Sequence, residues 1–88
     1  AGIIQFTKYI AAVYGKFGIT CNAISPGPFP NTNVQKDNKF MDNLSKRVPL
    51  NRIGVPDDLK GVTLLLASDA SNYINGTNIS VDGGWTIW

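Results

Sequence analysis

The sequence predicts an α/β fold with parallel strands. Three segments carry apolar residues at helical spacing, and two short runs rich in β-branched residues stand apart from them. The connection between the two runs is long enough to hold helices, and such a connection within one sheet gives a parallel pair of strands. The expected order is helix, strand, short helix, helix, strand. At 88 residues the chain forms at most one small domain, with marginal stability on its own.

The first helix is expected over residues 3–17. Apolar residues recur there at steps of three and four, which predicts one buried face. That face holds Ile3, Phe6, Ile10, Val13, Tyr14 and Phe17. Gly18 can take the left-handed conformation that closes a helix. Residues 19–24 then form a short, largely apolar run, typical of a parallel strand that is covered on both faces.

A loop rich in proline and asparagine follows at residues 25–38. Ligands bind at the carboxyl ends of strands in open α/β sheets, so this loop is a candidate binding segment. Apolar residues every four positions from Phe40 to Val48 predict a short helix, which Asp37 or Asn38 caps. Interleaved positive and negative charges indicate that residues 31–50 form a solvated lid.

The last helix is expected to begin at Pro56, because a proline and the neighbouring carboxylates of Asp57 and Asp58 are favourable in a first helical turn. Its expected buried face holds Leu59, Val62, Thr63 and Leu66. An Asn75-Gly76 turn then leads into a final strand over residues 77–81. Asp82-Gly83-Gly84 is expected to turn the chain after that strand.

Composition excludes several classes of function. A formal net charge of +2 is too small for the electrostatic footprint of a nucleic-acid-binding protein. No apolar run approaches the ~20 residues that span a bilayer, so neither a nucleic acid nor a membrane is an expected partner. The chain has no histidine and no glutamate, and its aspartates lack ligand spacing, so neither a Ser-His-Asp nucleophile nor a metal site is expected. The single cysteine, Cys21, fits a reducing compartment, and we expect a cytoplasmic location.

Several short motifs together resemble the short-chain dehydrogenase/reductase family. They are Asn22-Ala23-Ile24-Ser25-Pro26-Gly27, the stretches 14–19, 49–56 and 66–71, and Val81-Asp82-Gly83-Gly84. The Pro-Gly-Pro-Phe-Pro run resembles sugar-type or sugar-acid-type members. The resemblance implies that residues 1–88 are the C-terminal segment of a single Rossmann-like domain, a doubly wound parallel sheet. It also implies a parent enzyme that transfers a hydride between NAD or NADP and a small alcohol or carbonyl substrate.

The resemblance places the nicotinamide end of the coenzyme at the loop after the first strand. Pro26 and Gly27 are implied to shape this loop, and the backbone at Pro28 and Phe29 to meet the carboxamide. The family commonly has a threonine four residues after the glycine. Here that position is Asn31 and Thr32 comes next, so the polar contact stays open between these two.

No catalytic residue is assigned in this chain. Nothing in it matches the family's glycine-rich loop, its catalytic serine or its Tyr-x-x-x-Lys pair, so the chain alone is expected to be inactive without the N-terminal part of a parent protein. The alternative is a binding or assembly fragment that has no chemistry. Asn22 is interpreted as a structural tie rather than a catalytic group. Trp85 and Trp88 suit a subunit contact, so a homo-oligomer, a dimer or a tetramer, is expected.

Overall fold

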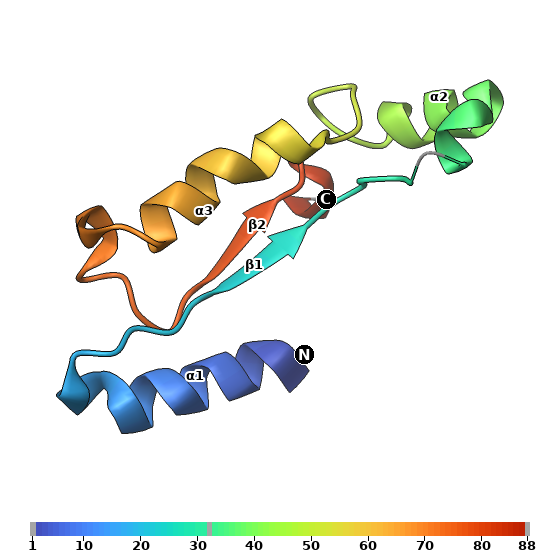
Figure 1. Cartoon of the computed structure of the whole chain (residues 1–88). Coiled ribbons are helices and arrows are strands. Elements are labelled where there is room, and N and C mark those ends of the chain that lie inside the picture. Colours follow the sequence, from blue (N-terminus) through green and yellow to red (C-terminus); the bar gives the residue numbers. More distant parts are fainter. Residues whose placement is uncertain (1, 32, 88) are drawn as a thin grey trace. The chain divides into compact units, whose positions relative to one another are not determined.

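The structure, a computed structural model, describes residues 2–31 and 33–87. Thr32 and Trp88, both singled out by the sequence, lie outside the described residues. The chain divides into two compact units, residues 1–25 with 60–79 and residues 26–59 with 80–88. In chain order the helices and strands are α1 (Gly2–Tyr14), β1 (Ala23–Pro26), α2 (Asn38–Lys46), α3 (Lys60–Leu66) and β2 (Asn78–Val81), with short 3-10 turns between them and after β2 (Figure 1).

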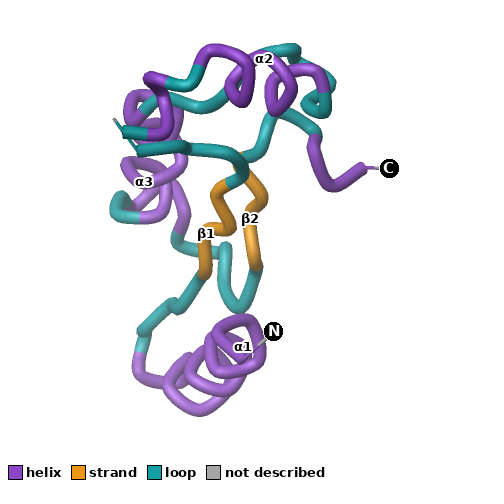
Figure 2. The backbone as a smooth tube through the Cα atoms, turned by 90° about the vertical axis from the view of Figure 1, so that its right-hand side faces the viewer, coloured by secondary structure: helices purple, strands orange, loops and turns teal. Residues whose placement is uncertain are grey.

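The two strands of the described chain pair in parallel, which confirms the predicted α/β class. Figure 2 shows them side by side. The Ala23 N–H donates to the Thr77 carbonyl at 2.9 Å, and the Gly27 N–H donates to the Val81 carbonyl at 2.9 Å. The offset between donor and acceptor is the same at both ends, so no bulge interrupts the register.

The first strand begins later than the sequence predicts. The run from residue 19 to residue 22 is not a strand, and the strand includes Ser25 and Pro26 instead. The cause is that the Cys21 N–H bonds to a side chain instead of to a backbone carbonyl of the other strand. It donates to the Asn75 Oδ1 at 2.9 Å. The Asn75 Nδ2 then donates to the Ala11 carbonyl at 3.3 Å, which joins this segment to α1. The prediction of a strand from residue 19 was therefore wrong.

Asn22 joins the same segments, as its interpretation as a structural tie requires. Its Nδ2 donates to the Ile74 carbonyl at 2.9 Å, and its Oδ1 accepts the Thr77 N–H at 3.1 Å. One amide thus satisfies two backbone groups of the stretch that leads into β2, next to the backbone bond from the Gly76 N–H to the Cys21 carbonyl at 2.8 Å. The contacts lie where β1 begins, at the end of the strand away from the proline-rich loop.

Helix α1 buries a different face from the one predicted. Its buried residues are Thr7 and Ala11, whereas Ile3 is 76% exposed and Phe6 is 64% exposed. Ala11 packs so closely on the Asn75-Gly76 turn that a Cβ added at Gly76 would lie 3.5 Å from its methyl group. Of the other residues on the predicted face, Ile10 is half-buried, and Phe17 is exposed but lies beside Tyr14, with ring centroids 6.3 Å apart. The end of the helix is as predicted: a 3-10 turn over Gly15–Phe17 closes at Gly18, with a φ of 79°.

Helix α2 confirms the predicted cap and corrects the predicted apolar face. The Asp37 side chain accepts the Phe40 N–H at 3.0 Å, so Asp37 rather than Asn38 is the cap. The helix ends at Lys46, two residues before Val48, which is nonetheless the most deeply buried side chain described, at 1% exposure. Phe40 is half exposed, so the helix does not bury it as predicted.

Helix α3 starts as the sequence predicts, through a 3-10 turn over Pro56–Leu59. Leu59, Val62 and Leu66 are half-buried on the predicted face. Thr63, also predicted there, is exposed. Within the described ranges, none of the helices is long and apolar enough to cross a membrane.

We predict that Asn22→Ala lowers the free energy of unfolding by about 1–3 kcal/mol, because it leaves the Ile74 carbonyl and the Thr77 N–H without their partners. Asn72→Ala, at an exposed position next to the same turn, is the matched control and should change stability little. Urea unfolding of the protein that carries this chain measures both. Equal stability of the Asn22 variant and the wild type would contradict the assigned role.

Candidate functional site

An open cavity of about 410 Å³ lies within the second unit, where both strands reach their carboxyl ends. Three chain segments and one helix-start residue line it. They are Pro28 and Phe29 after β1, Leu50 and Arg52 to Gly54, Asp58, and Ser80 to Gly84 at the end of β2. Loops that follow parallel strands meet at one edge of a sheet, which is where α/β proteins bind their ligands.

Gly27 brings the loop after β1 against the end of β2. A Cβ added at Gly27 would collide with the Asp82 side chain and lie 2.6 Å from the Asp82 Cα. No residue larger than glycine therefore fits without displacing backbone. The Gly27 N–H donates to the Val81 carbonyl in the last ladder bond, and Pro28 and Phe29, directly after it, line the cavity.

Asp82 builds the turn that closes the other side of the cavity. Its carboxylate accepts the Thr86 hydroxyl at 2.7 Å, the Gly84 N–H at 2.9 Å and the Thr86 N–H at 3.3 Å. These bonds, the Thr86 hydroxyl first, lower the pKa of Asp82 against the opposing effect of desolvation. Gly83 and Gly84 have φ values of 64° and 97°, which favour glycine. The turn predicted after the final strand is thus present.

The segment around Gly54 supports the loop after β1 from the side. The Gly54 N–H donates to the Pro28 carbonyl at 2.8 Å. A Cβ added at Gly54 would overlap the Phe29 ring, so this ring occupies the space that the glycine leaves open. Pro28 and Phe29 are therefore held by contacts from a segment well separated from them in the sequence.

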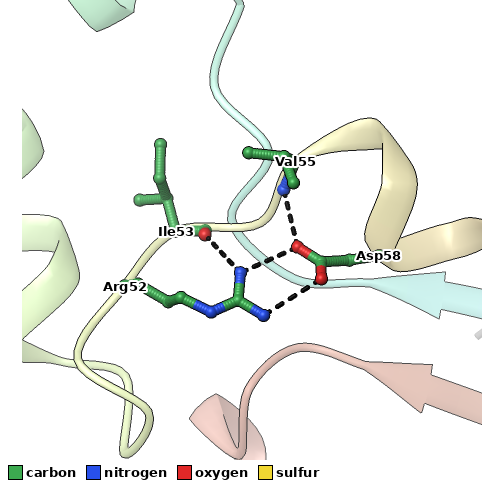
Figure 3. Close-up of polar contacts among 4 residues, drawn as sticks. All are labelled: Arg52, Ile53, Val55 and Asp58. Carbon is green, nitrogen blue, oxygen red and sulfur yellow. Dashed lines mark hydrogen bonds and ion pairs between the residues drawn. The ribbon is translucent and has the colours of Figure 1, made fainter.

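Arg52 and Asp58 form a two-point ion pair that also contacts Ile53 and Val55, the two chain neighbours of Gly54 (Figure 3). The Arg52 Nη1 donates to the Asp58 Oδ2 at 2.8 Å, and the Nη2 donates to the Oδ1 at 3.0 Å. The Nη1 also donates to the Ile53 carbonyl at 3.2 Å. The Asp58 Oδ2 accepts the Val55 N–H at 2.8 Å, a side-chain cap of the turn that precedes α3.

The two charges stabilise each other's ionised forms. The Arg52 hydrogen bonds, with a further contribution from the Val55 N–H, lower the pKa of Asp58 to about 2. The Asp58 carboxylate raises the pKa of Arg52. The side chains are 53% and 27% exposed, so water screens the pair and its fixed geometry is more important than its Coulomb energy.

The structure brings some of the predicted site residues together. Pro28 and Phe29 line the cavity, and Gly27 fixes their approach, whereas Pro26 and Asn31 are not among the lining residues. Thr32 lies outside the described residues. Sequence reasoning missed Arg52 and Gly54, and it assigned Asp58 only to the helix start. The six-residue spacing of Arg52 and Asp58 across a Gly-Val-Pro segment was the one sequence pattern that could have indicated their ion pair.

Among the described residues no group of three or more His, Cys, Asp or Glu could hold a metal ion.

Comparison with known proteins gives one consistent family. A family model described as enoyl-(acyl carrier protein) reductase matches residues 1–86. L-rhamnose-1-dehydrogenase from Scheffersomyces stipitis is 44% identical over 87 residues, covering 96% of this chain and 34% of the relative. 2-Dehydro-3-deoxy-D-gluconate 5-dehydrogenase from Escherichia coli is 40% identical over 88 residues, covering 97% of this chain and 35% of the relative. The chain thus spans about a third of the length of the curated relatives it matches.

Solved structures agree. A gluconate 5-dehydrogenase from Burkholderia cenocepacia, in complex with NADP and tartrate, matches with a TM-score of 0.89 and 37% identity over 98% of this chain and 35% of its own. A short-chain dehydrogenase from Leptospira borgpetersenii with bound NAD⁺ matches with a TM-score of 0.85 and 43% identity over 97% of this chain and 32% of its own. The α/β fold is therefore the Rossmann-like fold of these enzymes, and the chain belongs to the short-chain dehydrogenase/reductase family.

Proposed function

We propose that this chain is the C-terminal segment of a single Rossmann-like domain in an NAD- or NADP-dependent oxidoreductase. The whole protein transfers a hydride between the coenzyme and a small alcohol or carbonyl compound. Other parts of the protein supply the acid or base and the dinucleotide-phosphate site. This segment contributes the loop that meets the nicotinamide, a substrate lid at about residues 31–50 and contacts between subunits.

The observation that carries this proposal is the contact between Gly27 and Asp82. It places side-chain-free backbone at the carboxyl ends of both strands, next to a cavity that Pro28 and Phe29 line. A flat ring such as nicotinamide can approach such backbone closely, and backbone N–H and carbonyl groups are among the polar groups that orient a ligand in a small-molecule site. Asn31 and Thr32, a few residues further on, are the polar side chains that this loop can offer to the carboxamide or a phosphate.

We propose a sugar or a sugar acid as the substrate class. Two relatives named above act, by their names, on rhamnose and on a deoxygluconate, and a structural relative carries tartrate with NADP. The cavity wall joins an aromatic ring, Phe29, to the polar groups of Arg52 and Ser80. An apolar surface with a small number of polar groups is the usual composition of a small-molecule site.

Assays of the full-length protein with NAD and with NADP test the proposal directly. The substrates to compare are a series of aldoses and aldonic acids, with simple secondary alcohols as the reference series. We expect coenzyme reduction with at least one sugar or sugar acid at a higher kcat/KM than with the simple alcohols. Turnover of none of these compounds with either coenzyme, by a folded protein, would exclude the proposed reaction.

We predict that Gly27→Ala weakens coenzyme binding by about tenfold or more, because the added methyl group displaces the loop from Asp82 and misplaces the nicotinamide contacts. Gly61→Ala is the matched control, since a Cβ added there meets nothing within 4 Å. Titration calorimetry with NAD and NADP compares the two variants. Unchanged affinity in the Gly27 variant would show that this loop does not meet the coenzyme.

We also propose that the protein is a homo-oligomer, a dimer or a tetramer, and that the tail after β2 lies at a subunit contact. Trp85 is 39% exposed and Ile87 is 74% exposed in the short turn that ends the described chain.

We predict that Trp85→Ala weakens self-association by about 2 kcal/mol, as expected for a large aromatic residue at an interface centre. Sedimentation velocity of the full-length protein measures this. Tyr73→Ala, at a fully exposed aromatic residue, should leave the distribution unchanged, and a monomeric wild type would refute the proposal.

A further inference from the structure

We infer that Arg52 and Asp58 are positioning residues for the nicotinamide end of the coenzyme, acting through the peptide group between Ile53 and Gly54. This inference rests on the proposed function. Neither side chain is assigned a chemical step. Their role is to fix the backbone that supports Pro28 and Phe29 at the wall of the cavity.

The ion pair holds both peptide groups that flank Gly54. Arg52 donates to the Ile53 carbonyl at 3.2 Å, on one side of the glycine, and Asp58 accepts the Val55 N–H at 2.8 Å, on the other. The two-point contact between guanidinium and carboxylate joins these two bonds into one connected set (Figure 3). Glycine is the residue with the greatest backbone freedom, so it is the position that most needs fixed neighbours.

A planar peptide transmits this constraint to the loop after β1. The Ile53 carbonyl and the Gly54 N–H belong to one peptide group, so the direction of one sets the direction of the other. That N–H donates to the Pro28 carbonyl at 2.8 Å. The Phe29 ring lies where a Gly54 side chain would stand, so the same glycine also sets the position of the ring.

A purely structural role is the alternative, because Asp58 also caps the turn at Pro56–Leu59. The two roles make different predictions for ligands that lack the nicotinamide ring. A positioning role affects the whole coenzyme and leaves ADP-ribose, or its 2′-phosphate, bound as before. A structural role affects both kinds of ligand together, because it acts through the stability of the protein.

The ionisation of the pair provides a check on each variant. The pKa of Asp58 is about 2 in the folded chain and is ordinarily 3.8, so the folded state loses this proton more readily than the unfolded state. The stabilisation is therefore complete above pH 3.8 and is lost as the pH falls toward 2. Arg52→Gln should move the pKa of Asp58 back toward 3.8 in an NMR titration. An unchanged pKa would show that Arg52 does not hold the carboxylate in solution.

The deciding experiment uses the full-length protein and the single variants Arg52→Gln and Asp58→Asn, with the double variant. Asp58→Asn keeps a side-chain acceptor for the Val55 N–H and loses the charge. Lys8→Gln and Asp69→Asn, at exposed positions, remove the same charges elsewhere. Affinities for the coenzyme and for the matching ADP-ribose ligand are measured by calorimetry, and kcat is measured with the best sugar substrate.

We expect each single variant to bind the coenzyme about tenfold more weakly and to lose about tenfold to a hundredfold in kcat, with unchanged affinity for ADP-ribose. The double variant should lose no more coenzyme affinity or kcat than either single variant, because both substitutions remove the same ion pair. Gly54→Ala should give the same pattern with the ion pair intact, because the added methyl group displaces the Phe29 ring directly. This variant replaces an Arg52 or Asp58 variant that fails to fold.

Equal losses of affinity for coenzyme and for ADP-ribose, or a normal kcat in a folded variant, would overturn the inference while leaving the proposed function in place. A wild-type protein that binds neither coenzyme would overturn both.

Discussion

The second unit depends on one planar group, the peptide between Ile53 and Gly54. Its carbonyl is bound by Arg52 and its N–H is bound to Pro28, so a single rigid plane joins a charged pair to the loop that follows β1. An exposed ion pair contributes little stability by Coulomb attraction. The ion pair instead fixes the orientation of the two side chains, because a bidentate contact sets angles as well as distances. The cavity wall therefore has a defined geometry although its lining residues are half-buried or exposed.

The first unit uses the same principle with neutral groups. The amides of Asn22 and Asn75 each present a donor and an acceptor, and they complete the backbone hydrogen bonding of extended segments that have not yet entered the strand pair. Asn75 also reaches α1, so one side chain connects a helix, a turn and the approach to β1. Both units thus rely on polar side chains that bind backbone, in a chain whose large apolar residues are often exposed.

Local signals in the sequence predicted local structure well. The sequence predicted a left-handed Gly18, a helix start at Pro56 and a cap at either Asp37 or Asn38, each from residues within a few positions. The structure has the first two as predicted and selects Asp37 as the cap. The strand boundary at Ala23 was not predictable in the same way, because it depends on Asn75 far along the chain. The buried side of α1 was missed for a related reason: the spacing of apolar residues indicates a face but does not say which contacts the chain itself supplies. In the site, the family resemblance implied contacts by Pro28 and Phe29, and both residues line the cavity. The hydrogen bond from Gly54 to Pro28 joins segments far apart in the sequence, so no local pattern indicated it.

The wall of the cavity is made by segments that meet only through long-range contacts, from Gly27 to Val81 and from Pro28 to Gly54. Closing such long loops costs chain entropy before the contacts form, so we expect these contacts to be among those that open most readily in the native state. A ligand that binds only the closed arrangement shifts this local equilibrium by mass action. Amide hydrogen exchange at Gly27 and Gly54 reports on it, since each N–H is protected by one of these contacts. Exchange rates at these two amides, measured with and without a ligand, therefore compare the closed and open populations of the loop after β1.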